Sequence, residues 1–309
     1  MNEILVVGSI AMDTVVTLNR FPKAGETVIG NDIAFYPGGK GANQCIAIRR
    51  LGGNVQMCGM VGKDANGEIL RQLFANEGVP THFIFEGQKP TGMAQIQINE
   101  EGENSICIIP SANHEFSLRE LDAIDSALQN AALLVLQLEL TVEITEVLIR
   151  RANSYGVPVL LNPAPAAKLS PEVMAMVSYL TPNETELSFL ADMPVETVED
   201  AERAAQRLLA QGVKTVVATL GSQGALAVTP RQTILAEGFA VKAVDTVAAG
   251  DSFSGGLAVA LTEGKALPEA LRFANAVGAL TVCGKGAIPS LPKRERVELF
   301  LEQQTAPFR

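Results

Sequence analysis

The sequence is poor in the residues from which zinc sites, disulfide frameworks and imidazole-based catalysis are built. Its four cysteines are widely spaced, with no C-x-x-C pair, and it has only two histidines. The cysteines are Cys45, Cys58, Cys107 and Cys283, and the histidines are His82 and His114. This spacing fits neither zinc ligands nor a disulfide framework, so we expect four reduced thiols with structural roles.

Positive charge and long apolar runs are also scarce. The formal net charge is −10 and the isoelectric point is about 4.9, so the chain repels polyanions on average. We therefore expect neither nucleic acid nor an anionic membrane as a main partner. No basic segment precedes the first apolar run, Ile4 to Val7, and no apolar stretch is long enough to span a bilayer. We therefore expect a cytoplasmic protein.

Two nucleotide-binding fingerprints are absent, namely G-x-x-x-x-G-K-[ST] and G-x-G-x-x-G. Their absence argues against P-loop and dinucleotide-binding Rossmann proteins. The tripeptide Gly250-Asp251-Ser252 suggests a serine nucleophile, but that chemistry needs a nearby base, commonly histidine. Because both histidines fall at or within a segment that we assign to an accessory sheet, a serine hydrolase is disfavoured.

What the chain does have is an alternation of strand and helix patterns over 309 residues, of which 47% are hydrophobic. Short β-branched runs alternate with segments of helical period, as in the predicted helix Val198 to Gln211. Such alternation predicts a parallel sheet covered by helices on both faces. The predicted strands are Ile4–Gly8, Val55–Val61, Leu133–Leu138, Val157–Leu161 and Val213–Leu220.

Two segments interrupt this alternation, Asp13 to Pro37 and Gly92 to Ser111, and the second has hairpin character. Each leaves the α/β run and returns to it, which predicts a small accessory sheet that acts as a lid over the strand ends. No linker or internal repeat is present. We therefore expect one domain over residues 1–309, with a lid formed by about residues 12–37 and 91–112.

The first candidate for chemistry is the run from Asp245 to Gly256, which leads into a small-residue helix predicted over Leu257 to Leu261. Free backbone N–H groups of Ala248 to Asp251 at a helix N-terminus would form an anion hole. Asp251 would then lie beside a phosphate and accept a proton. The alternative is an ordinary acidic residue in a first helical turn that stabilises the helix dipole.

A second glycine cluster, Gly38 to Asn43, precedes a helix that runs to Leu51. Its small residues could bring the backbone, the Lys40 ammonium and the Asn43 amide close to a polar ligand. The alternative is a tight turn with a solvated lysine.

Two more polar clusters follow predicted strands, Thr181 to Glu186 and Thr219 to Gly224. In doubly wound sheets, ligands bind outside the carboxyl ends of the strands, which is where a nucleotide would lie. Asn183 could then reach phosphate, and Glu186 could hold Mg²⁺ through water. The alternatives are an N-cap for a helix over Glu184 to Leu190 and a turn into a strand over Ala225 to Val228.

Taken together, the order and spacing of these motifs resemble the ribokinase-like carbohydrate kinase family. The motifs are Gly-Gly-Lys-Gly-Ala-Asn at 38–43, Asn-x-x-Glu at 183–186, Thr-Leu-Gly-Ser at 219–222 and Asp-Thr-x-Ala-Ala-Gly-Asp at 245–251. The likeness extends from Gly8 to Pro292. It implies a three-layer α/β/α fold with a mostly parallel central sheet, a small β-sheet lid, and a homodimer formed through the lid.

The resemblance also implies residue roles. Asp251 would be the catalytic base, with anion-hole amides from Ala248, Ala249 and Gly250. The sugar would be held by Asp13, Gly39, Lys40, Gly41, Asn43, Glu139 and Asp251. ATP would contact Asn183, Thr219, Gly221, Ser222, Gly224, Gly250 and Asn275, with Glu186 in the Mg²⁺ network. A K⁺ activator would lie among Asp245, Val247, Thr281, Gly284, Gly286 and Ser290.

One position departs from the family pattern, because Ala11 stands where typical ribokinases have an asparagine. A missing hydrogen bond of about 1–3 kcal/mol would disfavour ribose relative to a sugar that lacks the matching hydroxyl. The sequence therefore predicts an ATP-dependent kinase for the primary hydroxyl of a pentose, ribose or a related sugar. The alternatives on the same fold are kinases for a deoxy sugar, another carbohydrate or a nucleoside. A non-catalytic sugar sensor is disfavoured, because the Asp251 motif is intact.

Overall fold

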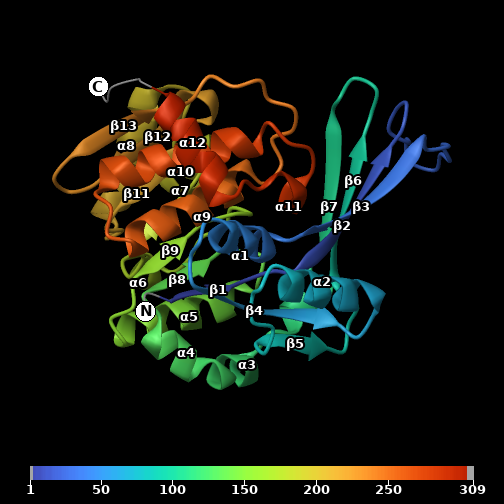
Figure 1. Cartoon of the computed structure of the whole chain (residues 1–309), viewed down its shortest axis with the longest axis horizontal. Helices are drawn as coiled ribbons and strands as arrows, with labels where there is room; N and C mark the ends of the chain where they lie inside the picture. Colours follow the sequence, from blue (N-terminus) through green and yellow to red (C-terminus); the bar gives the residue numbers. More distant parts are fainter. Residues whose placement is uncertain (1–2, 305–309) are drawn as a thin grey trace.

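The computed structural model describes residues 3–304, which build a large central sheet between two helical layers (Figure 1). The large sheet has the strand order β13-β12-β11-β10-β9-β8-β1-β4-β5, and its strands are parallel except that β12 runs antiparallel to β11 and β13. The strands are β1 (Ile4–Val7), β4 (Val55–Gly62), β5 (Ile84–Gly87), β8 (Leu133–Leu136), β9 (Val159–Leu161), β10 (Tyr179–Leu180), β11 (Val216–Thr219), β12 (Gly224–Val228) and β13 (Thr233–Glu237).

The sheet is buried on both faces because successive side chains of its apolar strands point in opposite directions. In β1, Ile4 and Val6 join one hydrophobic core, whereas Leu5 and Val7 join the other. The first core contains α1 (Lys40–Arg50), α2 (Ala65–Asn76), α9 (Ala249–Thr262), α10 (Leu267–Thr281) and α12 (Arg294–Gln303). The second contains α3 (Leu118–Ala123), α5 (Val142–Ser154), α6 (Pro171–Met174), α7 (Glu184–Ala191) and α8 (Val198–Ala210).

Shorter helical segments connect these elements. They are η1 (Ser111–Glu115), α4 (Asp125–Asn130), η2 (Gly221–Gln223) and α11 (Ala287–Ser290). No helix within residues 3–304 is long and apolar enough to cross a membrane.

A second sheet, which we call the small sheet, stands to one side of the main body (Figure 1). It has the order β3-β2-β6-β7 and consists of β2 (Ala11–Thr17), β3 (Asp32–Gly38), β6 (Gly92–Ile98) and β7 (Asn104–Ile109). β2 pairs with β3 in an antiparallel and with β6 in a parallel arrangement. The accessory sheet that the sequence predicts is therefore present.

Two polar side chains, of which Asn113 is buried and Asp64 half-buried, attach the base of the small sheet to the main body. Asn113, in η1, accepts a hydrogen bond from the backbone N of Ile10 at 3.0 Å and donates to its carbonyl at 2.9 Å. Asp64, which caps α2, accepts from the backbone N and the hydroxyl of Thr91 at 2.7 and 2.6 Å. Both strands that leave the main body, β2 and β6, are thus anchored immediately before their first residues.

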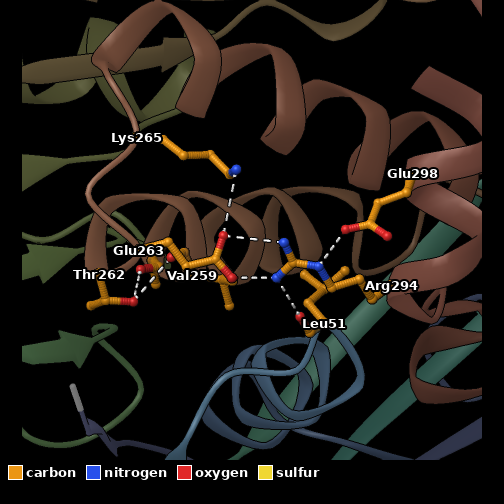
Figure 2. A network of polar contacts seen from close by, with 8 residues as sticks. Leu51, Val259, Thr262, Glu263, Lys265, Arg294 and Glu298 are labelled. Carbon is orange, nitrogen blue, oxygen red and sulfur yellow. Dashed lines mark hydrogen bonds and ion pairs between the residues drawn. The ribbon is translucent and has the colours of Figure 1, made fainter. Parts of the chain in front are cut away.

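Helices α1 and α9 lie side by side in the first helical layer and approach closely (Figure 1). A Cβ atom at Gly255 would lie 2.8 Å from the Cβ of Ala47, so glycine is needed for this approach. The C-terminal ends of both helices meet α12. Arg294 of α12 forms an ion pair with Glu263, which follows α9, and donates to the carbonyl of Leu51, which follows α1, at 3.2 Å (Figure 2). Glu298 and Lys265 extend this cluster. Three helices are therefore joined at one point.

Most predicted elements are found, with shifted ends. β8 ends at Leu136, two residues before the predicted Leu138, because the chain turns towards Glu139. The helix predicted over Leu257 to Leu261 is found, but α9 begins earlier, at Ala249, and already contains Ser252 to Gly256. Gly255 and Gly256 are tolerated inside this helix because they pack against α1 and α10, respectively.

Candidate active site

Two cavities open at the carboxyl ends of the main strands, and the first is also bordered by the small sheet. We call the first, of about 270 Å³, the sugar-side cavity and the second, of about 200 Å³, the phosphate-side cavity, after the ligands that the sequence predicts for the residues that line them. Both are lined by Lys40, Ala248 and Asp251. The two cavities therefore meet at an acidic residue, a basic residue and the N-cap of a helix.

Asp251 lies in the first turn of α9 and is only 7% exposed. Its Oδ2 accepts a hydrogen bond from Nδ2 of Asn43 at 2.8 Å, and its Oδ1 accepts one from Nε2 of Gln44 at 3.0 Å. Both amides come from the first two turns of α1, so the contact between α1 and α9 places them. Asp251 is thus far more constrained than an acid that only stabilises a helix dipole.

The sugar-side cavity gathers a second and a third carboxylate around Lys40. Glu139 follows β8 and accepts hydrogen bonds from the Ser9 hydroxyl and, at 3.1 Å, from the backbone N of Lys40. Asp13 reaches the cavity from β2 of the small sheet and packs against Gly38. Within residues 3–304, the Asp13 carboxylate accepts no hydrogen bond. The cavity therefore offers a partly buried carboxylate with unused acceptors.

This crowding of carboxylates changes their proton affinity. Burial, together with the neighbouring Glu139 and Asp251, raises the pKa of Asp13 to about 7, although Lys40 opposes the rise. Burial alone would disfavour the charged form of Lys40, but Asp251, Glu139, Glu186 and Asp13 outweigh it and hold its pKa above the ordinary value. Lys40 is therefore a cation at neutral pH, surrounded by acidic groups from both cavities.

Asn43 has an unused acceptor as well. Its amide nitrogen is committed to Asp251, whereas its buried Oδ1 has no hydrogen-bond partner among the described residues. A buried amide oxygen without a partner costs about 1–3 kcal/mol, so such an atom in a cavity wall points to a ligand that donates a hydrogen bond. A sugar hydroxyl is such a donor.

The phosphate-side cavity lies at the N-terminus of α9. Ala248, the N-cap, has a left-handed backbone with a φ of 60°. The amide of Ala249 donates to the carbonyl of Thr246 at 3.3 Å, whereas no backbone acceptor among the described residues bonds the amides of Gly250 and Asp251. Free amides at a helix N-terminus attract anions. This end of the site is therefore suited to a phosphate group.

Asn183 and Glu186 line the same cavity from the N-terminus of α7. They form a reciprocal cap in which Glu186 N donates to Asn183 Oδ1 at 2.8 Å and Asn183 N donates to Glu186 Oε2 at 2.9 Å. The capping alternative is thus realised, and it leaves the Asn183 amide nitrogen and one Glu186 oxygen for a ligand. Burial raises the pKa of Glu186, although the hydrogen bond from the backbone N–H of Asn183 and the positive charge of Lys40 oppose the rise.

Not every predicted site residue lines a cavity. Gly41 packs against the backbone of Gly8 and Ser9, where a Cβ would come within 2.7 Å. Asn275 is buried and donates to the carbonyls of Ala236 and Glu237 at 2.8 and 3.2 Å, so it supports the end of β13. Thr219 does line the phosphate-side cavity, whereas the residues of the following turn do not. Those residues are Gly221, Ser222 and Gly224.

The residues predicted for a monovalent cation come together from two segments. The carboxylate of Asp245 accepts from the backbone N of Val247 at 3.0 Å and from that of Gly286 at 2.9 Å. Gly284 packs closely against Ser290, and its amide donates to the carbonyl of Thr281 at 3.0 Å. Asp245 thereby joins the segment before α9 to the turn that follows α10.

Ser252 is excluded as a nucleophile. It is fully buried in α9, and its hydroxyl donates to the carbonyl of Ala249 at 2.9 Å. The His82 ring packs at a tilt against Phe83, and His114 is exposed in η1, so neither histidine serves Ser252 as a base.

Sequence reasoning missed several buried polar residues around the site. Ser9, Gln44, Gln137 and Asn162 all bond to one another or to the acidic residues. Gln137 and Asn162 each follow an apolar strand directly, which is a usable signal because ligands gather at such strand ends. Gln44 gives no signal of its own.

Comparisons with known proteins agree with this geometry. The pfkB family of carbohydrate kinases matches residues 1–294. The chain belongs to this family and is therefore a phosphotransferase whose acceptor is an alcohol group of a carbohydrate.

Individual relatives cover almost the whole chain. A ribokinase of Haemophilus influenzae is 39% identical over 298 residues, which are 96% of this chain and 97% of the relative. A deoxyribokinase of Salmonella typhimurium is 35% identical over 301 residues, 97% and 98% of the two chains.

Solved structures agree as well. The ribokinase of Thermotoga maritima has a TM-score of 0.91 at 37% identity, with 98% of this chain and 100% of the other covered. Arabidopsis thaliana ribokinase, complexed with ribose and ATP, has a TM-score of 0.91 at 35% identity and coverages of 97% and 99%. The three-layer α/β/α fold and the family predicted from the sequence are confirmed.

Proposed function

We propose that this carbohydrate kinase transfers the γ-phosphoryl group of ATP to the primary hydroxyl of a pentose, with Asp251 as the base. One observation carries the proposal: a cavity lined by carboxylates and a cavity at a helix N-terminus meet at Asp251. A sugar hydroxyl in the first cavity and a phosphate in the second would both contact this carboxylate. Phosphoryl transfer needs mainly such positioning and charge stabilisation from the protein.

On the sugar side, Asp13, Glu139 and Asn43 supply acceptors for vicinal hydroxyls, and charge-assisted hydrogen bonds are the stronger kind. Gly39 brings the backbone of the turn before α1 to the same wall of the cavity. Lys40 lies between the two cavities, where its charge can stabilise a transferring phosphoryl group. Asp251 accepts the proton of the attacking hydroxyl.

On the phosphate side, the amides of Gly250 and Asp251 and the N-terminus of α9 stabilise the negative charge that develops, and Ala248 and Ala249 shape the turn that exposes them. Asn183 and Thr219 extend the cavity towards the rest of the nucleotide. Mg²⁺, held through water by Glu186, would neutralise phosphate charge when bound. The unused Glu186 oxygen fits this role.

K⁺ fits as an activator next to the site. Hard carbonyl and carboxylate oxygens are its ligands, and Asp245 draws together the segments that carry them. Because Val247 is followed directly by the N-cap of α9, a cation there would steady the anion-binding turn. Such a cation would raise activity without any direct role in the reaction.

The small sheet serves as the lid in this proposal, and residues 1–309 act as one catalytic unit. Ala94, Ile106 and Ile108 of β6 and β7 form an apolar wall of the sugar-side cavity. Closure over the sugar would exclude water and limit ATP hydrolysis. Ile33 and Phe35 of β3 are 54% and 60% exposed, which supports a homodimer that buries the small sheet.

Ala11 favours a second candidate acceptor, a deoxypentose. Its methyl group lines the sugar-side cavity beside Asp13, where a polar side chain would bond a hydroxyl. A sugar without a hydroxyl at this position would not bury an unpaired hydroxyl against the methyl group. We therefore place 2-deoxyribose beside ribose as a substrate.

ADP release with Mg²⁺ and K⁺ across a panel of pentoses, deoxypentoses, hexoses and nucleosides tests the proposal. Asp251→Asn keeps the side-chain shape and should lower kcat by about 10²–10⁴-fold, because a general base is lost. Sugar binding without turnover would indicate a sensor instead. Wild-type activity in Asp251→Asn would refute Asp251 as the base.

A further inference from the structure

A chain of buried amide side chains lies behind Asp251. Gln44 of α1 and Gln137, which follows β8, are 0% and 1% exposed and line neither cavity. Gln44 contacts Asp251 directly, and Gln137 contacts Gln44. Neither residue can touch sugar or nucleotide, so their role must act through Asp251.

The hydrogen bonds among these amide side chains all point the same way, from Gln137 through Gln44 and Asn162 to the backbone carbonyl of Thr181. Asn162 Nδ2 donates to the backbone carbonyl of Thr181 at 2.9 Å, and Asn162 Oδ1 accepts from Gln44 Nε2 at 3.2 Å. The same Gln44 nitrogen donates to Asp251 Oδ1 at 3.0 Å. Gln137 Nε2 donates to Gln44 Oε1 at 2.7 Å.

This direction is set by the main sheet and not by Asp251. A backbone carbonyl can only accept, so Thr181 obliges Asn162 to turn its nitrogen towards the sheet and its oxygen towards Gln44. An amide oxygen can only accept as well, so Gln44 must present its nitrogen at that point. The nitrogen has two hydrogens, and the second meets Asp251.

We propose that Gln44 is a positioning residue that holds Asp251 as a hydrogen-bond acceptor in one fixed orientation, an inference that rests on the proposed role of Asp251 as the base. With Gln44 donating to Oδ1 and Asn43 to Oδ2, the plane of the carboxylate is fixed at both oxygens. The remaining lone pairs are left for the sugar hydroxyl. A base that is aligned before the substrate arrives needs no rearrangement during the reaction.

The unused oxygen of Gln137 supports a functional reason for the chain. Gln137 Oε1 is buried, packs against Gly8, and has no hydrogen-bond partner among the described residues. Burying a polar atom in this way destabilises the fold, and an apolar side chain of similar size would avoid that cost. What the glutamine provides is the donor that orients Gln44.

The test replaces Gln44 by methionine, which has a similar length and no donor. We expect kcat to fall by about 10–100-fold, because a small displacement of a catalytic group is costly. The KM values for sugar and ATP should change by less than about threefold, because the lost contact acts on the reacting geometry and not on ground-state binding. Gln56→Met on β4 is the matched control, since Gln56 lies opposite Leu5 of the neighbouring strand β1 and also has a buried oxygen without a partner among the described residues.

A double-mutant cycle separates positioning from general damage. In the Asp251→Asn background, Gln44→Met should cause no further loss of residual kcat, since the group that it positions is gone. An equal loss in both backgrounds, or wild-type kcat in Gln44→Met, would overturn the inference. Wild-type activity in Asp251→Asn would overturn the proposed base instead, whatever Gln44→Met does.

If Gln44→Met does not fold, Gln44→Leu serves in its place, because it also lacks the donor. Its kcat should fall by about 10–100-fold, as for the methionine variant, while circular dichroism stays unchanged. Unchanged kcat in that folded variant would likewise overturn the inference.

Discussion

Replacing Asp13 by asparagine should stabilise the ligand-free protein and impair the enzyme. The pKa of Asp13 is raised from 3.8 to about 7 by burial and by the charges of Glu139 and Asp251. The folded protein therefore favours the protonated form of the Asp13 carboxyl group. The unfolding free energy decreases as the pH rises from the pKa of the unfolded chain through that of the folded protein. Three pKa units of about 1.36 kcal/mol each amount to about 4 kcal/mol at pH 8. Asparagine has no charge and avoids this loss.

The assay is urea unfolding of both proteins between pH 4 and pH 8. The difference in unfolding free energy should be small at pH 4, should grow by about 1.4 kcal/mol per pH unit, and should level off above pH 7. Asp32→Asn, on the exposed edge of the small sheet, is the control and should show no such growth. A difference for Asp13→Asn that does not depend on pH would refute the reasoning.

The same variant should lose activity, because the Asp13 carboxylate is proposed to bond a sugar hydroxyl. Its kcat/KM for the preferred pentose should fall by about 10–100-fold, in line with a charge-assisted hydrogen bond of about 1.5–3 kcal/mol. An unchanged kcat/KM would remove Asp13 from the proposed sugar site, while the stability result would stand.

Three further predictions concern specificity, the cation and the helix junction. Ala11→Asn should raise kcat/KM for ribose relative to 2-deoxyribose by about 10-fold or more, because a hydroxyl gains a partner; an unchanged ratio in a two-substrate assay would contradict it. Asp245→Asn should abolish the difference in activity between K⁺ and Na⁺ buffers, and a retained difference would place the cation elsewhere. Arg294→Met should lower the unfolding free energy by about 1–3 kcal/mol, because Glu263 and the Leu51 carbonyl lose their partner. Arg296→Met, exposed on the same helix, should have little effect, and equal losses would show that the junction is not stabilising.

The sequence predicts strands well where both faces are buried and poorly where they are not. β1 and β8 are continuous apolar runs, and their burial on both faces makes that pattern unambiguous. β13 lies at the edge and is mostly exposed, so its residues carry no comparable pattern. β10 has only two residues, and its pairing depends on its neighbours. Such elements are defined by tertiary contacts that a local pattern does not contain.

The same distinction holds for the site. Glycine-rich turns and an acid at a helix start are local patterns, and they led to Lys40, Asn43 and Asp251. The family resemblance added Glu139, and the structure brings all four residues to one cavity. Gln44 occupies an ordinary helical position, and its partner Asp251 is 207 residues away in the sequence. Only the packing of α1 on α9 makes that contact.

The close approach of α1 and α9 has a consequence for biosynthesis. Asn43 and Asp251 are 208 residues apart, so the ribosome completes the sugar-binding half long before it makes the base. An incomplete chain therefore contains no catalytic centre, and contacts of such long range form late and slowly in folding. Newly made protein should gain activity only once α9 has docked against α1.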